Sequence, residues 1–188
     1  NTLSGGPDHS AGAADEPAWL GIVGHQECGQ AAGVWCANGY EDEIAGDQRA
    51  DDERSLLFDS ETLSEPIELL GHPVVHLRLR VDRPLALVAV RVEDVAPDGA
   101  SLLVSWGLLN LAHREGHEYP SPLEPGESYD VRVESRVCGY RFPQGHRIRL
   151  AVSPTYWPHA WPSPEPVTLE VAADGSSFLE LPVRERSS

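Results

Sequence analysis

The sequence predicts an all-β protein, a jelly-roll β-sandwich of about nine antiparallel strands. Three observations support this fold class. From Ser55 onward apolar residues recur at every second position, which is typical of half-buried strands. The 17 Gly and 16 Pro residues fall largely between these segments, where tight turns need them. No segment shows the apolar spacing of an amphipathic helix.

The predicted strands follow one another in chain order. The apolar run 19–23 indicates a first strand, and alternation then predicts strands at residues 75–81, 88–92, 102–106, 129–137, 148–152, 167–171 and 179–183. Pro97, Asp98 and Gly99 supply turn chemistry between two of these strands and predict a β-hairpin. We expect two packed antiparallel sheets, each with one buried face and one face in water.

Composition divides the chain into three segments. Residues 1–17 contain almost nothing to bury and predict a flexible linker or tail. Residues 18–54 are interpreted as a connecting segment. Within it, residues 24–48 fit a loop and an irregular strand equally, and the acidic stretch from Tyr40 to Arg54 predicts a solvated connection. Residues 55–188 form the predicted sandwich, and a chain of 188 residues can bury a core without metal or disulfide support.

The net charge of the chain limits the classes of partner that it can bind. The chain has 30 acidic and 14 basic residues, a formal net charge of −16, and it contains no Lys. Such a surface repels phosphate backbones and anionic lipids, so we expect no nucleic acid and no membrane partner. No stretch approaches the roughly 18 apolar residues of a spanning helix. Because the chain contains no Met, we expect that Asn1 is not a translation start.

The cysteines indicate the redox environment. Cys28, Cys36 and Cys138 are an odd number, so no disulfide framework can be assigned, and we expect reduced thiols. A single bridge between Cys28 and Cys36 stays open as an alternative. Reduced cysteines favour a cytoplasmic location, whereas an acidic chain without Lys is also compatible with a secreted protein.

Catalytic and metal-binding patterns are weak. No G-x-S-x-G motif occurs, so we assign no catalytic residue. His72 and His76 lie roughly 13 Å apart if they share a strand, too far to share an ion. The other clusters fit surface or loop positions better than metal sites: His113 with His117, His25 with Cys28 and Cys36, and the acidic run of Asp47, Asp51, Asp52 and Glu53. We expect no metal and no cofactor.

The strongest candidate site is an aromatic loop. Tyr156, Trp157, His159 and Trp161 lie in a segment with three prolines, which prevent it from pairing as a central strand. Large rings on a stiff loop suit recognition, because little entropy is lost when they bind. We interpret these residues as an interface or ligand loop. The alternative is a hydrophobic plug that closes one end of the sandwich.

Five groups of residues, in this order, resemble the C-terminal domain of the X-prolyl dipeptidyl-peptidase and cocaine-esterase-like serine hydrolases. The match covers about residues 40–165. Each motif is short, but their order and spacing together are fairly specific. The residues are Asp47-Gln48-Arg49 with Asp51, Asp52, Ser55 and Leu56; Pro66-Ile67-Glu68 with Gly71; Asp94-Val95-Ala96-Pro97-Asp98-Gly99; Leu123-Glu124-Pro125-Gly126; and Gly145-His146-Arg147-Ile148-Arg149-Leu150 with Ser153.

The resemblance implies a galactose-binding-like jelly roll that follows an α/β-hydrolase domain carrying a Ser-His-Asp triad. No triad residue maps onto this sequence, and the shared motifs are interpreted as devices of the fold. The implied function is a non-catalytic accessory domain of an X-Pro dipeptidyl-peptidase or acyl esterase. Such a domain shapes the substrate cleft, or forms the interface with the upstream domain or a homo-oligomer. The alternative function is a stand-alone carbohydrate-binding module, because such modules share the jelly roll and stack exposed Trp rings on sugars.

Overall fold

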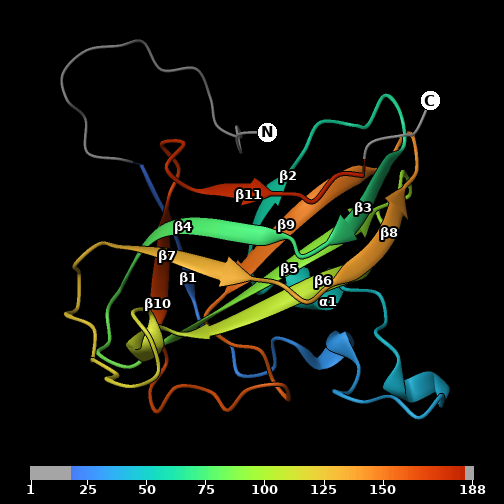
Figure 1. Ribbon diagram of the computed structural model, residues 1–188. Helices are drawn as coiled ribbons and strands as arrows, with labels where there is room; N and C mark the ends of the chain where they lie inside the picture. Colours follow the sequence, from blue (N-terminus) through green and yellow to red (C-terminus); the bar gives the residue numbers. More distant parts are fainter. Residues whose placement is uncertain (1–17, 185–188) are drawn as a thin grey trace.

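The computed structural model describes residues 18–184 and confirms the all-β fold class (Figure 1). This part of the chain holds eleven strands, against about nine expected, with one α-helix of four residues and three short 3-10 helices. The linker expected over residues 1–17 lies outside the described residues. The elements are β1 (Trp19–Val23), η1 (Gln30–Ala32), η2 (Glu41–Glu43), α1 (Arg49–Asp52), β2 (Leu56–Asp59), β3 (Ile67–Gly71), β4 (Val74–Val81), β5 (Leu87–Val95), β6 (Ser101–Asn110), η3 (Leu111–His113), β7 (Tyr129–Glu134), β8 (Cys138–Phe142), β9 (Arg147–Ser153), β10 (Thr168–Ala172) and β11 (Phe178–Glu180).

The strands form two packed sheets and a small third one. The five-stranded sheet has the order β1-β10-β4-β11, with β7 also paired to β4, and the four-stranded sheet has the order β2-β9-β5-β6. All of these pairs are antiparallel. Strands β3 and β8 form a separate pair at one end of the molecule (Figure 1). The result is a β-sandwich, in which the jelly-roll connectivity stays a prediction.

The core lies between the two larger sheets. One hydrophobic cluster joins the inward-facing residues of β4, β5, β9 and β10. Leu79 of β4, Val90 of β5 and Leu169 of β10 are fully buried in it. Each aliphatic side chain of this size contributes about 1.5–3 kcal/mol when it leaves water. The period-two pattern therefore identified the inner face of each of these strands correctly.

The expected β-hairpin is confirmed as β5 and β6. Val88 lies opposite Leu109 and Val95 opposite Ser101, with a shift of register after Val92. At the turn, Gly99 has a φ of 88°, which favours glycine, and its N–H donates to the Ala96 carbonyl at 2.9 Å.

The strand expected over residues 129–137 is shorter in the structure, because β7 ends at Glu134. The Ser135 N–H donates to the Pro73 carbonyl and the Arg136 N–H donates to the Trp106 carbonyl, so the chain passes from the five-stranded sheet to β6. Gly107 allows this close passage, since a Cβ there would lie 2.7 Å from the Glu134 carbonyl oxygen. A new strand, β8, then begins at Cys138.

The expectation that each sheet has a wet outer face is wrong for β5, which is buried along its whole length. Val88, Val90 and Val92 face the core, whereas Leu87 and Ala89 belong to a second cluster. That cluster also contains Ala32, Trp106 and Tyr156. The segments 24–55 and 154–162 thus cover the outer face of the four-stranded sheet. We call these two segments the cover. The segment interpreted as a connection contributes β1 to one sheet and most of the cover to the other.

We predict that Leu79→Ala lowers the free energy of unfolding by about 2–5 kcal/mol, because it leaves a cavity in the fully buried centre of the core. Urea denaturation measures this loss. Leu70→Ala is the matched control, since Leu70 is exposed on β3. Equal effects of the two substitutions would contradict the location of the core.

Candidate functional site

A buried ionic network joins the cover to the four-stranded sheet. The guanidinium of Arg91, on β5, donates from Nε to Glu93 Oε1 at 2.7 Å and from Nη2 to Asp52 Oδ1 at 3.0 Å. The second oxygen of Asp52 accepts from Arg149 Nη1 at 2.9 Å. Arg149 in turn donates from Nε and Nη2 to the two oxygens of Asp59. Arg91 and Glu93 are completely buried, so these charges have exchanged water for one another.

For each of these groups, burial and ion pairing have opposite effects on the pKa. Burial raises the pKa of the Glu93 carboxyl, and the charge of Arg91 opposes that shift. Burial by itself lowers the pKa of the Arg91 guanidinium, but the charge of Glu93 raises it above its ordinary value. The hydrogen bond to Asp59 raises the pKa of the Arg149 guanidinium. Each buried charge is therefore compensated only by its partners, and the loss of one partner leaves another charge buried without compensation.

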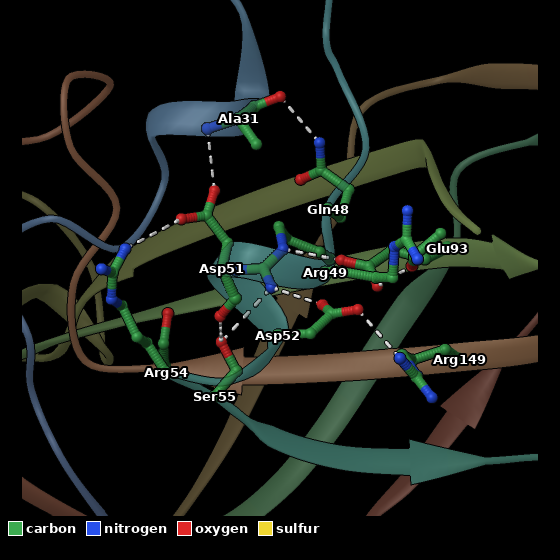
Figure 2. A network of polar contacts seen from close by, with 12 residues as sticks. Ala31, Gln48, Arg49, Asp51, Asp52, Arg54, Ser55, Glu93 and Arg149 are labelled. Carbon is green, nitrogen blue, oxygen red and sulfur yellow. Dashed lines mark hydrogen bonds and ion pairs between the residues drawn. The ribbon is translucent and has the colours of Figure 1, made fainter. Parts of the chain in front are cut away.

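Hydrogen bonds around the helix α1 hold parts of the cover together (Figure 2), and one attaches the cover to β6. Asp51 Oδ2 accepts from the Ala31 N–H at 2.9 Å, and Gln48 Nε2 donates to the Ala31 carbonyl at 2.7 Å. The Gln48 N–H donates to the Ser101 carbonyl of β6 at 2.8 Å. The acidic run was expected to be a solvated surface. That expectation is wrong for Asp51 and Asp52, which are buried because they bind backbone and arginine partners.

A second buried carboxylate connects three strands. Asp94 of β5 accepts from Tyr140 Oη of β8 at 2.7 Å, and its other oxygen lies 2.8 Å from Nδ1 of His146, next to β9. Burial raises the pKa of the Tyr140 phenol, and the bond to Asp94 adds to this shift. Gln48, Asp52, Asp94, His146 and Arg149 belong to the motifs that carried the resemblance, and each has a structural contact here.

The structure divides the predicted aromatic loop into an inner and an outer part. Tyr156 is fully buried and His159 is partly buried against it, with ring centroids 5.0 Å apart. These two residues are packed inward, as the alternative of a hydrophobic plug expects. They cover the outer face of the four-stranded sheet, however, and not an end of the sandwich. Trp161 is 82% exposed and stacks obliquely with the partly buried Trp157, at 5.2 Å between ring centroids. Only this outer pair is free for recognition.

A groove of about 420 Å³ lies beside Trp161. Its walls come from three chain segments: residues 85–87 at the start of β5, residues 108–110 at the end of β6, and residues 160–164 of the proline-rich loop. The lining is mainly apolar and includes Leu85, Leu87, Leu108, Trp161, Pro162 and Pro164. An apolar protein segment fits such a lining better than a sugar, which needs several hydrogen-bonding groups.

Sequence reasoning missed a second exposed aromatic group at Trp35. The centroid of its ring lies 5.8 Å from that of Trp106, and the guanidinium carbon of Arg136 lies over both rings. Trp35 falls within residues 24–48, where the sequence fitted a loop and an irregular strand equally. An isolated Trp in an otherwise small and polar segment was the available signal.

The described residues contain no arrangement for nucleophilic catalysis. Between residues 18 and 184 no Ser, Thr or Cys side chain forms a hydrogen bond with a histidine ring, although Asp94 and His146 form a carboxylate–imidazole pair. Within the same range no three His, Cys, Asp or Glu side chains gather in the way that metal ligands do. No helix in this part of the chain is both long and apolar enough to cross a membrane.

Comparison with known proteins places this architecture. Residues 7–180 match the family model described as the X-Pro dipeptidyl-peptidase C-terminal non-catalytic domain. A cocaine esterase from Rhodococcus sp. (strain MB1 Bresler) is 29% identical over 114 residues, which are 60% of this chain and 20% of the esterase. The chain therefore spans about a fifth of the length of the curated relatives it matches.

Solved structures share the fold at low sequence identity. An aminopeptidase from a marine sediment archaeon, Thaumarchaeota archaeon, superposes with a TM-score of 0.78 at 22% identity, covering 92% of this chain and 34% of the aminopeptidase. An α-amino acid ester hydrolase superposes with a TM-score of 0.76 at 22% identity, covering 92% of this chain and 33% of the hydrolase.

We predict that Asp52→Asn lowers the free energy of unfolding by about 3–5 kcal/mol, because it leaves Arg91 and Arg149 without their shared counter-ion in a buried site. Chemical denaturation at pH 7 measures the loss. Glu134→Gln breaks an exposed ion pair with Arg132 and should cost less than about 1 kcal/mol. A cost for Asp52→Asn as small as that of the control would refute the structural importance of the network.

We predict that protonation of His159 in acid lowers the free energy of unfolding. Burial lowers the pKa of this imidazole from 6.5, so the folded chain takes up the proton less readily than the unfolded chain. The contribution to stability is complete above pH 6.5 and decreases as the pH falls below it. His159→Gln should flatten this part of the stability curve, measured by denaturation across pH, whereas substitution of the exposed His25 should leave it unchanged. An unaltered curve for His159→Gln would contradict the assignment.

Proposed function

Because this chain belongs to the family of X-Pro dipeptidyl-peptidase C-terminal non-catalytic domains, we propose that it is the accessory domain of a serine hydrolase. The upstream part of that polypeptide would be an α/β-hydrolase domain that cleaves esters or X-Pro peptide bonds. The single observation that carries the proposal is the family match over residues 7–180. The small share of each relative that the chain covers supports it, since most of a relative's length lies elsewhere.

The role that fits the geometry is to form one wall of the substrate cleft. The sandwich is held rigid by its core and its buried ion pairs, and it presents Trp161 and the adjoining groove at its surface. A large ring held by neighbouring prolines loses little entropy on contact, so it is suited to pack against another domain. A wall of this kind excludes water from the reaction and limits the size of the substrate.

We further propose a cytoplasmic location. Cys28, Cys36 and Cys138 are free thiols, and Cys28 is completely buried among hydroxyl groups. This arrangement supports a reducing compartment. Mass spectrometry of the natural protein after alkylation of free thiols, without prior reduction, tests the point.

Assays of the 188-residue chain alone test the non-catalytic role. We expect no turnover of p-nitrophenyl esters or Xaa-Pro anilides and no covalent labelling by a fluorophosphonate, because the chain lacks an activated hydroxyl between residues 18 and 184. The polypeptide from the complete open reading frame should be labelled once, upstream of this chain. Labelling within the 188 residues would overturn the proposal, and so would a reading frame without a hydrolase domain.

A substitution at the exposed ring tests the wall. In the polypeptide from the complete reading frame, Trp161→Ala should reduce kcat/KM at least about tenfold, because loss of the ring opens the cleft to water. Tyr119→Ala is the matched control, since Tyr119 is equally exposed on a loop that does not line the groove. Equal activity of the Trp161 variant and the wild type would exclude the loop from the cleft.

A further inference from the structure

The position of Arg136 is fixed by contacts on several sides. Its N–H donates to the Trp106 carbonyl at 2.9 Å, and its carbonyl accepts from Ser105 Oγ at 2.6 Å. Its guanidinium carbon lies 4.5 Å from the ring centroid of Trp35 and 5.1 Å from that of Trp106. The guanidinium is therefore held in place by two aromatic rings at the surface of the cover.

This cation has no anionic partner among residues 18–41 and 43–184. No ion pair or side-chain hydrogen bond reaches its guanidinium in that range, although acidic residues outnumber basic ones by 30 to 14 in the chain. Arg132, four residues earlier, already pairs with Glu134 at 3.0 Å. The guanidinium carbon lies over two aromatic rings, the residue is exposed, and the N–H donors of the guanidinium have no acceptor among the described side chains. The edge that these donors form matches the two oxygens of a carboxylate.

The surroundings of Arg136 resemble the centre of a protein interface. Trp35 is 66% exposed, and the same loop also exposes Val34, Tyr40 and Ile44. Exposed apolar side chains gathered on one short loop mark interaction sites, and Trp, Tyr and Arg are the residues enriched at their energetic centres. Because the chain has a net charge of −16, an arginine without an acidic partner stands out at this position.

We propose that Arg136, with Trp35, receives an Asp or Glu carboxylate from the upstream hydrolase domain and is the centre of the contact between the two domains. This inference rests on the proposed function. The ring of Trp106 contacts both Trp35 and His159, so this site adjoins the loop that carries Trp161. One large partner can therefore cover both places. A second copy of the chain is a poorer occupant, because two bodies with a charge of −16 repel each other.

The test compares the complete polypeptide with the 188-residue chain, which has its own hydrophobic core. In the complete polypeptide, Arg136→Glu and Trp35→Ala should each lower the thermal midpoint by at least about 4 °C, because truncating or reversing one side of a desolvated charge contact is costly. Arg136→Lys should recover part of the loss. In the 188-residue chain the same substitutions should lower the midpoint by only about 2 °C or less, because there only the contacts with Trp106 and between Arg136 and Trp35 are lost.

Arg132→Glu is the matched control, since Arg132 is exposed on the adjoining strand β7 and its ion pair with Glu134 is internal to the chain, so the small loss should be the same in both contexts. A second arm uses a charge reversal: an Asp or Glu of the hydrolase domain changed to Arg should restore the midpoint lost in Arg136→Glu.

Three results would overturn the inference. The first is an equal loss in both contexts, which would make the stack an internal stabilising contact only. The second is the absence of any loss in the complete polypeptide. The third is a concentration-dependent dimer of the 188-residue chain that Arg136→Glu abolishes, which would assign the site to a second copy. A reading frame without a hydrolase domain would instead remove the proposed function itself, so the two failures are distinguishable.

Discussion

The buried guanidinium of Arg91 is the constraint on which the rest of the structure depends. A charge on the outer face of β5 would ordinarily face water, but here Asp52 and Glu93 replace the water and the sheet face is closed. Removing one member of such a network leaves an uncompensated charge, so the network specifies where the cover must lie. Asp52 extends this specification to β9 by binding Arg149 as well.

The surface features that matter for function follow from this attachment. The cover carries Trp35 and Trp161, and it places the Trp106 ring beneath both loops. The hydrophobic core makes the sandwich rigid, and the ion pairs fix the position of the cover relative to the core. The domain holds two aromatic loops and Arg136 in fixed positions at its surface, where we propose that a hydrolase domain docks.

The sequence alone predicted the parts of the fold that local patterns control. Alternation identified the inner faces of β4, β5, β9 and β10, and the turn at Gly99 identified the hairpin. It failed for Arg91 and Glu93, because charged residues in alternation normally indicate a solvated face. Their partner Asp52 lies in an acidic run 39 residues away from Arg91, and no local rule connects the two. The aromatic loop was found because its prolines are a local signal, whereas the stack of Arg136 on Trp35 joins segments a hundred residues apart.

Native-state hydrogen exchange of Asp52→Asn tests the central claim, that the ionic network holds the cover on the sheet, most directly. The amide of Gln48 bonds across the boundary of the cover to the carbonyl of Ser101 on β6, and the amide of Trp157 joins the two segments of the cover through the carbonyl of Cys28. The amide of Leu169 lies within the five-stranded sheet. We expect Gln48 and Trp157 to lose protection in the variant by at least about tenfold more than Leu169 does. A uniform loss at all three amides, or no loss at the first two, would contradict it.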